Sequence, residues 1–147
     1  MFKFILLVTL VAVAAAEVEL VVKDCGSHDA IINSIRVDQC DAEPCIVHKG
    51  QDYTIHVNFT ATRTVQEAHN VLHGGIGFLQ APFPLHPENA CQGSVQCPIV
   101  SGQTYEYVQT MTCPSFAPSV SVLARWEVKD EHRQDIFCFT TKLSIRG

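Results

Sequence analysis

The sequence predicts an all-β protein, a two-sheet antiparallel β-sandwich of the immunoglobulin-like type. Apolar and polar residues alternate with period two in several segments, helical periodicity is scarce, and Gly, Pro and Asn turns separate the segments. Each alternating segment is expected to be a strand with one apolar and one polar face. About seven such strands are typical of a sandwich. The Cys–Trp–Cys spacing of true immunoglobulin domains is absent, which indicates another sandwich family.

The N-terminal segment has the pattern of a secretory signal peptide. Lys3 gives a basic start, residues 4–15 form an uncharged apolar run, and Ala14 and Ala16 place small residues at a cleavage site. A membrane anchor is the alternative, but the run is too short to span a bilayer comfortably. We therefore expect residues 1–16 to be a signal peptide and residues 17–147 to form one domain.

The strands follow in chain order. The most regular alternation covers residues 53–60, 120–129 and 137–145, with Leu123 as an exception in the second segment. Less regular candidates are residues 18–23, 31–37, 68–78 and 103–111. The charged stretch at 129–135 is expected to be a solvated hairpin turn.

Two segments combine proline, glycine and apolar residues without alternating. In residues 73–87, glycines allow close approach to the backbone, and Pro82 and Pro84 are expected to hold Phe83 on a stiff segment outside the sheets. Residues 112–118 form a second proline-stiffened loop. Two such loops suit the mouth of a hydrophobic cavity; the alternative is that both pack their aromatic rings into the core.

Charge and motifs exclude several functions. Without the signal segment, the chain has nine Lys and Arg residues and fifteen Asp and Glu residues, which gives a net charge of −6. A negative net charge does not suit nucleic-acid binding. Seven histidines would cancel this charge at low pH. The sequence contains no GxSxG element and no phosphate-binding loop, and we predict no enzyme and no catalytic residue. Asn58 begins an N-glycosylation sequon on the polar face of its segment.

Seven cysteines in a secreted chain predict three disulfides and one free thiol. Short spacings favour pairing within 40/45 and within 91/97, but spacing alone leaves the connectivity open. No CxxC pair occurs, and we predict no metal site.

An ordered set of motifs over nearly the whole domain resembles the MD-2-related lipid-recognition (ML) family, which includes the Niemann–Pick type C2 proteins and the group 2 mite allergens. The motifs are Lys23-Asp24-Cys25-Gly26, Cys40 to Pro44-Cys45, Lys49-Gly50, His73-Gly74, Pro82-Phe83-Pro84, Cys91 to Cys97-Pro98-Ile99, Tyr105-Glu106-Tyr107, Trp126 and Phe137-Cys138.

The resemblance implies a lipid cavity between the two sheets and the bridges Cys25–Cys138, Cys40–Cys45 and Cys91–Cys97. It leaves Cys113 free, at a mouth framed by Phe83 and residues 113–118. The lipid-binding residues that it implies are Val37, Phe83, Tyr107, Cys113, Val122, Ala124, Trp126 and Phe139. Two positions differ from the mammalian sterol carrier: Phe139 replaces a second Trp, and Ala117 replaces a Tyr at the mouth. The smaller residue at the mouth leaves the choice of lipid open.

The function that the resemblance implies is that of a secreted, monomeric lipid carrier with no cofactor. It would bind a sterol or a fatty acid and transfer it, by transient membrane contact, to a membrane, a membrane sterol transporter or a receptor. Its place would be extracellular or the lumen of endosomes and lysosomes. Innate-immune recognition of bacterial lipid, carriage of chemical signals, and a structural module with a filled core are the alternatives.

Overall fold

The structure is a computed structural model that describes residues 8–12, 20–40 and 42–147. Of the predicted signal peptide, only residues 8–12 lie within this range, and they form neither helix nor strand. The described residues form nine strands and one short 3-10 helix. They are β1 (Lys23–Asp24), β2 (Ala30–Val37), β3 (Cys45–His48), β4 (Asp52–Ala61), β5 (His69–Ile76), β6 (Leu79–Phe83), η1 (Ala90–Gln92), β7 (Thr104–Thr112), β8 (Ser121–Lys129) and β9 (Asp135–Arg146).

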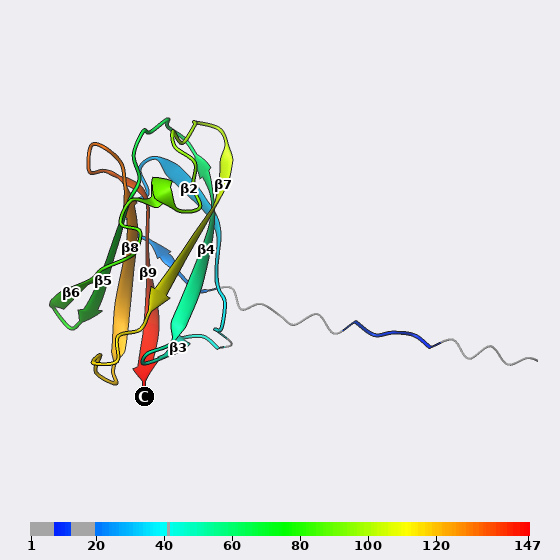
Figure 1. Cartoon of the computed structure of the whole chain (residues 1–147), viewed down its shortest axis with the longest axis vertical. Helices are drawn as coiled ribbons and strands as arrows, with labels where there is room; N and C mark the ends of the chain where they lie inside the picture. Colours follow the sequence, from blue (N-terminus) through cyan, green and yellow to red (C-terminus); the bar gives the residue numbers. More distant parts are fainter. Residues whose placement is uncertain (1–7, 13–19, 41) are drawn as a thin grey trace, which may run out of the picture.

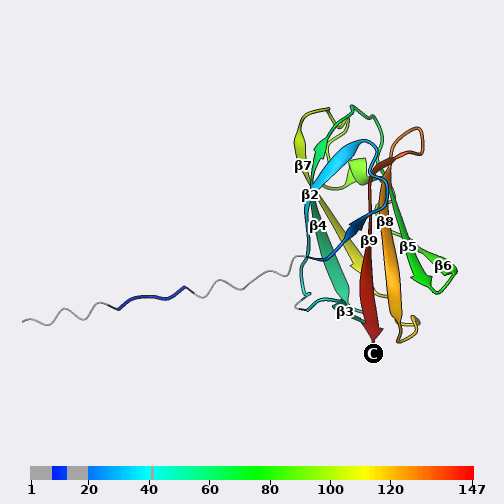
Figure 2. The ribbon, with the colours of Figure 1, turned by 180° about the vertical axis from the view of Figure 1, so that it is seen from behind.

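The strands make two sheets that face each other, which confirms the predicted all-β sandwich (Figure 1). The larger sheet has the order β1-β9-β8-β5-β6, with β3 paired to β9, and the smaller has the order β2-β4-β7. The β3–β9 pair is parallel, and the other pairs are antiparallel. Seen from behind, β2 and β4 lie side by side in front of β7, while β9, β8 and β5 run along the opposite layer (Figure 2).

The period-two pattern explains which face each strand buries. In β4, Tyr53, Ile55, Val57 and Phe59 are buried between the sheets, while the intervening side chains face outward. The exception in β8 has a structural reason, because Leu123 lies on the outer face and is 46% exposed. The predicted hairpin turn after β8 is confirmed, since the amide of Asp130 donates to the carbonyl of Gln134 and closes the β8–β9 hairpin. The turn is not solvated throughout, because Asp130 is buried.

Two strands were not predicted. β3 has only four residues and no alternation long enough to detect. The expectation that Phe83 lies outside the sheets is wrong, because Leu79–Phe83 forms β6. This strand lies at the edge of its sheet, with a neighbouring strand on one side only. Proline is tolerated in an edge strand, because no second neighbour needs its missing N–H as a donor. The ring of Phe83 lies over Gly74, where an added Cβ would approach its Cε2 to 2.5 Å.

The interior is divided along its length. Toward the end of the sandwich where β9 begins, which is uppermost in Figure 1, aromatic rings pack between the sheets. The ring centroids of Phe59 and Phe137 lie 5.2 Å apart, and those of Tyr107 and Phe137 lie 5.3 Å apart. The three predicted bridges, Cys25–Cys138, Cys40–Cys45 and Cys91–Cys97, are all present. The aromatic cluster therefore packs the half of the sandwich where β9 begins (the upper half), and the residues that line the cavity lie toward the half where β9 ends (the lower half).

Candidate functional site: an apolar cavity between the sheets

The cavity holds about 770 Å³ of empty space, including the part that is open to solvent. Both sheets line it: β2, β4 and β7 on one side and β3, β5, β6, β8 and β9 on the other. Besides the residues predicted from the sequence, its lining includes Leu20, Tyr53, Ile55, Leu72, Met111, Leu143 and Ile145.

Seven of the eight lipid-binding residues suggested by the sequence come together on this lining. They are Val37, Phe83, Cys113, Val122, Ala124, Trp126 and Phe139. The eighth, Tyr107, is not a lining residue and lies behind Trp126. The strand pattern already placed Tyr53, Ile55, Leu143 and Ile145 on inward faces, and this alternation was the signal that could have added them to the predicted set.

Aromatic residues make the closed end of the cavity. The rings of Trp126 and Phe139 are stacked, with centroids 6.3 Å apart and planes 4° apart. Behind them, the indole Nε1 of Trp126 donates a hydrogen bond of 3.1 Å to the hydroxyl of Tyr107. Because its polar atom is directed away from the cavity, Trp126 presents only ring carbon to a ligand.

Phe83 at the end of β6 and Cys113 and Pro114 in the segment after β7 also line the cavity. Phe83 and Pro114 are half-buried lining residues, which marks where the cavity reaches the surface. Cys113 is a free cysteine that is only 2% exposed. Burial raises the pKa of its thiol, so at neutral pH it lines the cavity as a small apolar group. Its backbone is fixed by hydrogen bonds to Gly50 and Gln51.

Large apolar side chains remain exposed around the same end of the sandwich. We call them the apolar rim: Ile76, Phe78 and Leu79 at the β5–β6 turn, Phe116 in the loop after β7, and Leu123 on β8. Phe78 is fully exposed and Phe116 is 88% exposed. Large exposed apolar patches mark sites of contact with a membrane or another protein.

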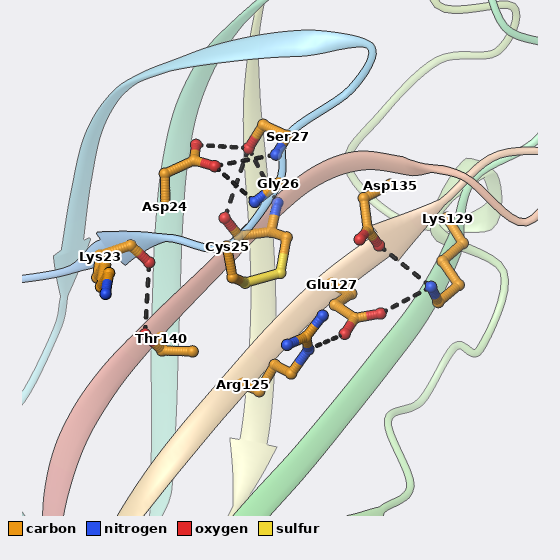
Figure 3. The surroundings of a disulfide bond; sticks show 11 residues. Lys23, Asp24, Cys25, Gly26, Ser27, Arg125, Glu127, Lys129, Asp135 and Thr140 are labelled. Atoms are coloured by element: carbon orange, nitrogen blue, oxygen red, sulfur yellow. Dashed lines mark hydrogen bonds and ion pairs between the residues drawn. A yellow bond between two sulfur atoms is a disulfide. The ribbon is translucent and has the colours of Figure 1, made fainter.

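Charged groups gather on the outer face of the larger sheet, away from the cavity. Glu127 is buried there between Arg125 and Lys129, next to the Cys25–Cys138 bridge (Figure 3). Burial alone would raise the pKa of Glu127, but hydrogen bonds from Arg125 and Lys129 hold it below its usual value. These groups neutralise one another, and the sulfur of Cys138 is in a disulfide, so the cluster offers no metal site.

The histidines also fail to form a metal site. His69 and His73 have the i, i+4 spacing of a helical metal pair, but both lie on β5, where that spacing separates them by about 13 Å. The ring of His69 instead contacts two carboxylates, Glu67 at 3.0 Å and Glu88 at 3.3 Å.

A buried carboxyl pair joins the chain before β2 to the β8–β9 hairpin. Asp29 is 1% exposed, and its Oδ1 lies 2.6 Å from Nδ1 of His28. Within the described residues, no donor forms a hydrogen bond with its Oδ2. Burial, followed by the neighbouring carboxyl group of Asp130, raises the pKa of Asp29 to about 6. The folded protein therefore binds a proton at Asp29 more tightly than the unfolded chain does.

This pair predicts that the protein is more stable at pH 5 than at pH 7.5. Because the pKa of Asp29 rises on folding from 3.8 to about 6, its contribution is complete below pH 3.8 and is lost as the pH rises through about 6. The urea midpoint should therefore fall between pH 5 and pH 7.5. In an Asp29→Asn variant, whose amide donates to Asp130 at every pH, this fall should be smaller. An equally large fall in the variant would show that other groups cause it.

Comparison with known proteins places the chain in a family. A family model described as "ML domain" matches residues 19–145. NPC intracellular cholesterol transporter 2 from Bos taurus is 34% identical over 125 residues, which covers 85% of this chain and 84% of that protein. The crystal structure of a Niemann–Pick type C2 protein from the Japanese carpenter ant superposes with a TM-score of 0.80 at 25% identity, covering 86% of this chain and 99% of that one.

A more distant structure shares the fold alone. Chicken MD-1, crystallised with lipid IVa, superposes with a TM-score of 0.57 at 15% identity over 84% of this chain and 87% of that one. Within the described residues, no helix has the length and apolar character needed to cross a membrane. The match over residues 19–145 shows that the chain belongs to the ML domain family, whose members bind lipids and are not enzymes.

Proposed function

We propose that this protein is a secreted carrier that holds one apolar lipid, a sterol or a fatty acid, between its sheets. It passes the lipid to a membrane or to a partner protein. The observation that carries this proposal is the cavity itself, which lies between the two sheets and has an apolar lining. A lipid placed there is withdrawn from water, which is worth about 25 cal/mol per Å² of apolar surface.

Relatives support the class of ligand. The bovine relative is named as a cholesterol transporter. With so few polar atoms in the lining, shape decides which lipid fits. The transfer needs no covalent step, because the ligand is held by apolar contacts alone.

Extraction of the purified protein with organic solvent, followed by mass spectrometry, tests the ligand class. We expect a sterol or a fatty acid, and the delipidated protein should bind it again in solution. Recovery and rebinding of bacterial lipid, without sterol or fatty acid, would support innate-immune recognition instead. A delipidated protein that binds none of these lipids would contradict the carrier function.

Trp126 provides a direct reporter of binding, because it is the only tryptophan and it lines the cavity. We expect a fluorescent sterol to quench its emission, or to accept energy from it, with a saturable dependence on sterol concentration. A non-fluorescent fatty acid should reverse the effect if both ligands share the cavity. An emission spectrum that stays unchanged at saturating sterol would place the binding site elsewhere.

The apolar rim suits delivery to a membrane. Phe78 and Leu79 extend into solvent from the β5–β6 turn, and Phe83 lies at the other end of β6. Lys142 pairs in register with Leu123 of the rim and adds a positive charge beside it. Apolar side chains next to a basic residue favour docking on an anionic bilayer.

Replacing Phe78 and Leu79 together by serine is expected to slow lipid transfer to anionic vesicles at least about fivefold, because two large apolar groups no longer enter the bilayer. Lipid affinity should stay unchanged, since neither residue lines the cavity. An Ile31→Ser variant is the matched control, because Ile31 is 60% exposed but lies on β2, outside the rim. Equal transfer rates in all three proteins would exclude a role of the rim in delivery.

Secretion and glycosylation complete the proposal. Residues 1–16 act as the signal peptide, so N-terminal sequencing of the secreted protein should begin at Glu17. The side chain of Asn58 projects from the outer face of β4, where Asn33 and Glu106 contact it. This outward position supports a glycan at Asn58. An Asn58→Gln variant should therefore lose the mass that an endoglycosidase removes from the secreted protein.

A further inference from the structure

We propose that a buried hydrogen-bond bridge between the sheets, made by Asn70, Tyr107 and Gln109, fixes the closed end of the cavity. The bridge thereby sets the longest apolar ligand that the protein accepts. This inference rests on the proposed carrier function and adds to it a determinant of ligand length.

The bridge joins the two sheets directly. Asn70 lies on β5 of the larger sheet, whereas Tyr107 and Gln109 lie on β7 of the smaller sheet. The hydroxyl of Tyr107 donates to Oδ1 of Asn70 at 2.6 Å, and Nδ2 of Asn70 donates to Oε1 of Gln109 at 3.1 Å. Tyr107 is 1% exposed and the two amides are 5% exposed, so water does not compete for these bonds.

The remaining polar atoms of both amides are also satisfied. Nδ2 of Asn70 donates a second bond, of 2.8 Å, to the carbonyl of Pro87. Nε2 of Gln109 donates to the carbonyls of His86 at 2.9 Å and Thr110 at 3.1 Å. A buried network with every group paired resists opening, because separating the sheets there would leave several polar groups without partners. Near the bridge, the two sheets are therefore held at a fixed separation.

The bridge also immobilises the end wall of the cavity. Trp126 lines the cavity and donates its indole N–H to the same Tyr107 hydroxyl. The bridge residues themselves are not part of the lining, and the rings of Phe137 and Phe59 fill the interior beyond them. If the indole moved aside to admit a longer ligand, its buried N–H would lose the hydrogen bond to the Tyr107 hydroxyl. Widening of the sandwich is thus confined to the lower half, and the distance from the mouth to Trp126 limits ligand length.

Binding of a series of saturated fatty acids, from dodecanoic to tetracosanoic acid, tests this inference. For the delipidated wild-type protein, we expect affinity to rise with chain length and then to fall sharply at a limiting length. Asn70→Ala removes the bonds between the sheets and leaves space behind Trp126. This variant should prefer longer acids, with a gain of about tenfold for acids just beyond the wild-type limit, as expected for about two further buried methylene groups.

Two further variants make the test decisive. Asn33→Ala is the matched control, because it removes an amide that makes two hydrogen bonds on the exposed outer face, to Asn58 and Thr60. Its length limit should equal that of the wild type. Tyr107→Phe keeps the ring volume and removes only the hydroxyl. If Asn70→Ala does not fold, this variant tests whether the bridge sets the limiting ligand length. It should shift the limit in the same direction and change the emission of Trp126.

The possible outcomes separate the two proposals. An unchanged length limit in folded Asn70→Ala or Tyr107→Phe would overturn the assignment of the bridge, while the carrier function would stand. A wild-type protein that binds none of the acids and no cholesterol would overturn the carrier function, and the length determinant with it. A shift in the bridge variants without a shift in Asn33→Ala supports the inference.

Discussion

Replacing Cys25 and Cys138 together by alanine is expected to lower the free energy of unfolding by about 4–5 kcal/mol. The bridge connects positions 113 residues apart, so it restricts the unfolded chain far more than a short bridge does. Around it, the carboxylate of Asp24 accepts hydrogen bonds from the amides of Gly26 and Ser27, and the hydroxyl of Ser27 accepts one from the amide of Cys138 (Figure 3). These native contacts remain in the variant, and the loss should therefore come mainly from the unfolded state.

The pair Cys91 and Cys97 gives a matched control. These cysteines are only six residues apart, and the same chain-entropy relation predicts a loss of about 2 kcal/mol when both are replaced by alanine. Urea unfolding under non-reducing conditions measures both losses. Equal losses for the two double variants would show that loop closure is not the source of the stabilisation.

The sequence predicted the strands whose two faces differ most strongly. Residues 53–60, 120–129 and 137–145 correspond to β4, β8 and β9, because one face of each packs between the sheets and the other is polar. β3 was not predicted, because its four residues are too few to show an alternation of apolar and polar side chains. β6 was not predicted, because proline normally argues against a strand. Pro82 is acceptable in β6 because this strand lies at the edge of the sheet. For the candidate strand at 18–23, only Lys23 is in a strand, and residues 18 and 19 lie outside the described part.

The sequence predicted much of the cavity lining but not the contacts at its closed end. The inward residues of alternating strands, together with the family resemblance, indicated Val122, Ala124 and Trp126, and all three line the cavity. Nothing in the sequence indicated that Asn70 on β5 and Gln109 on β7 meet, because that contact depends on how the two sheets face each other. Contacts between sheets are set by tertiary packing, on which a period within one strand carries no information.

Filling the cavity from β8 with an Ala124→Phe substitution is expected to weaken lipid binding by about 100-fold or more. Ala124 is buried on the inner face, and it lines the cavity between Val122 and Trp126. A phenyl ring at this position occupies space that the ligand would use. The loss of only about 110 Å² of ligand burial, at about 25 cal/mol per Å², corresponds to about 2.8 kcal/mol and thus to about 100-fold in affinity.

The neighbouring residue supplies the control for this prediction. Leu123→Phe places the same ring on the same strand, but on the outer face, where Leu123 is 46% exposed. Its lipid affinity should match that of the wild type. Trp126 remains the only tryptophan in both variants, so its emission can follow binding in each, and urea unfolding confirms that each is folded. Wild-type affinity in a folded Ala124→Phe protein would mean that the lipid does not lie between the sheets at this position, because the added ring and the ligand cannot share the same space.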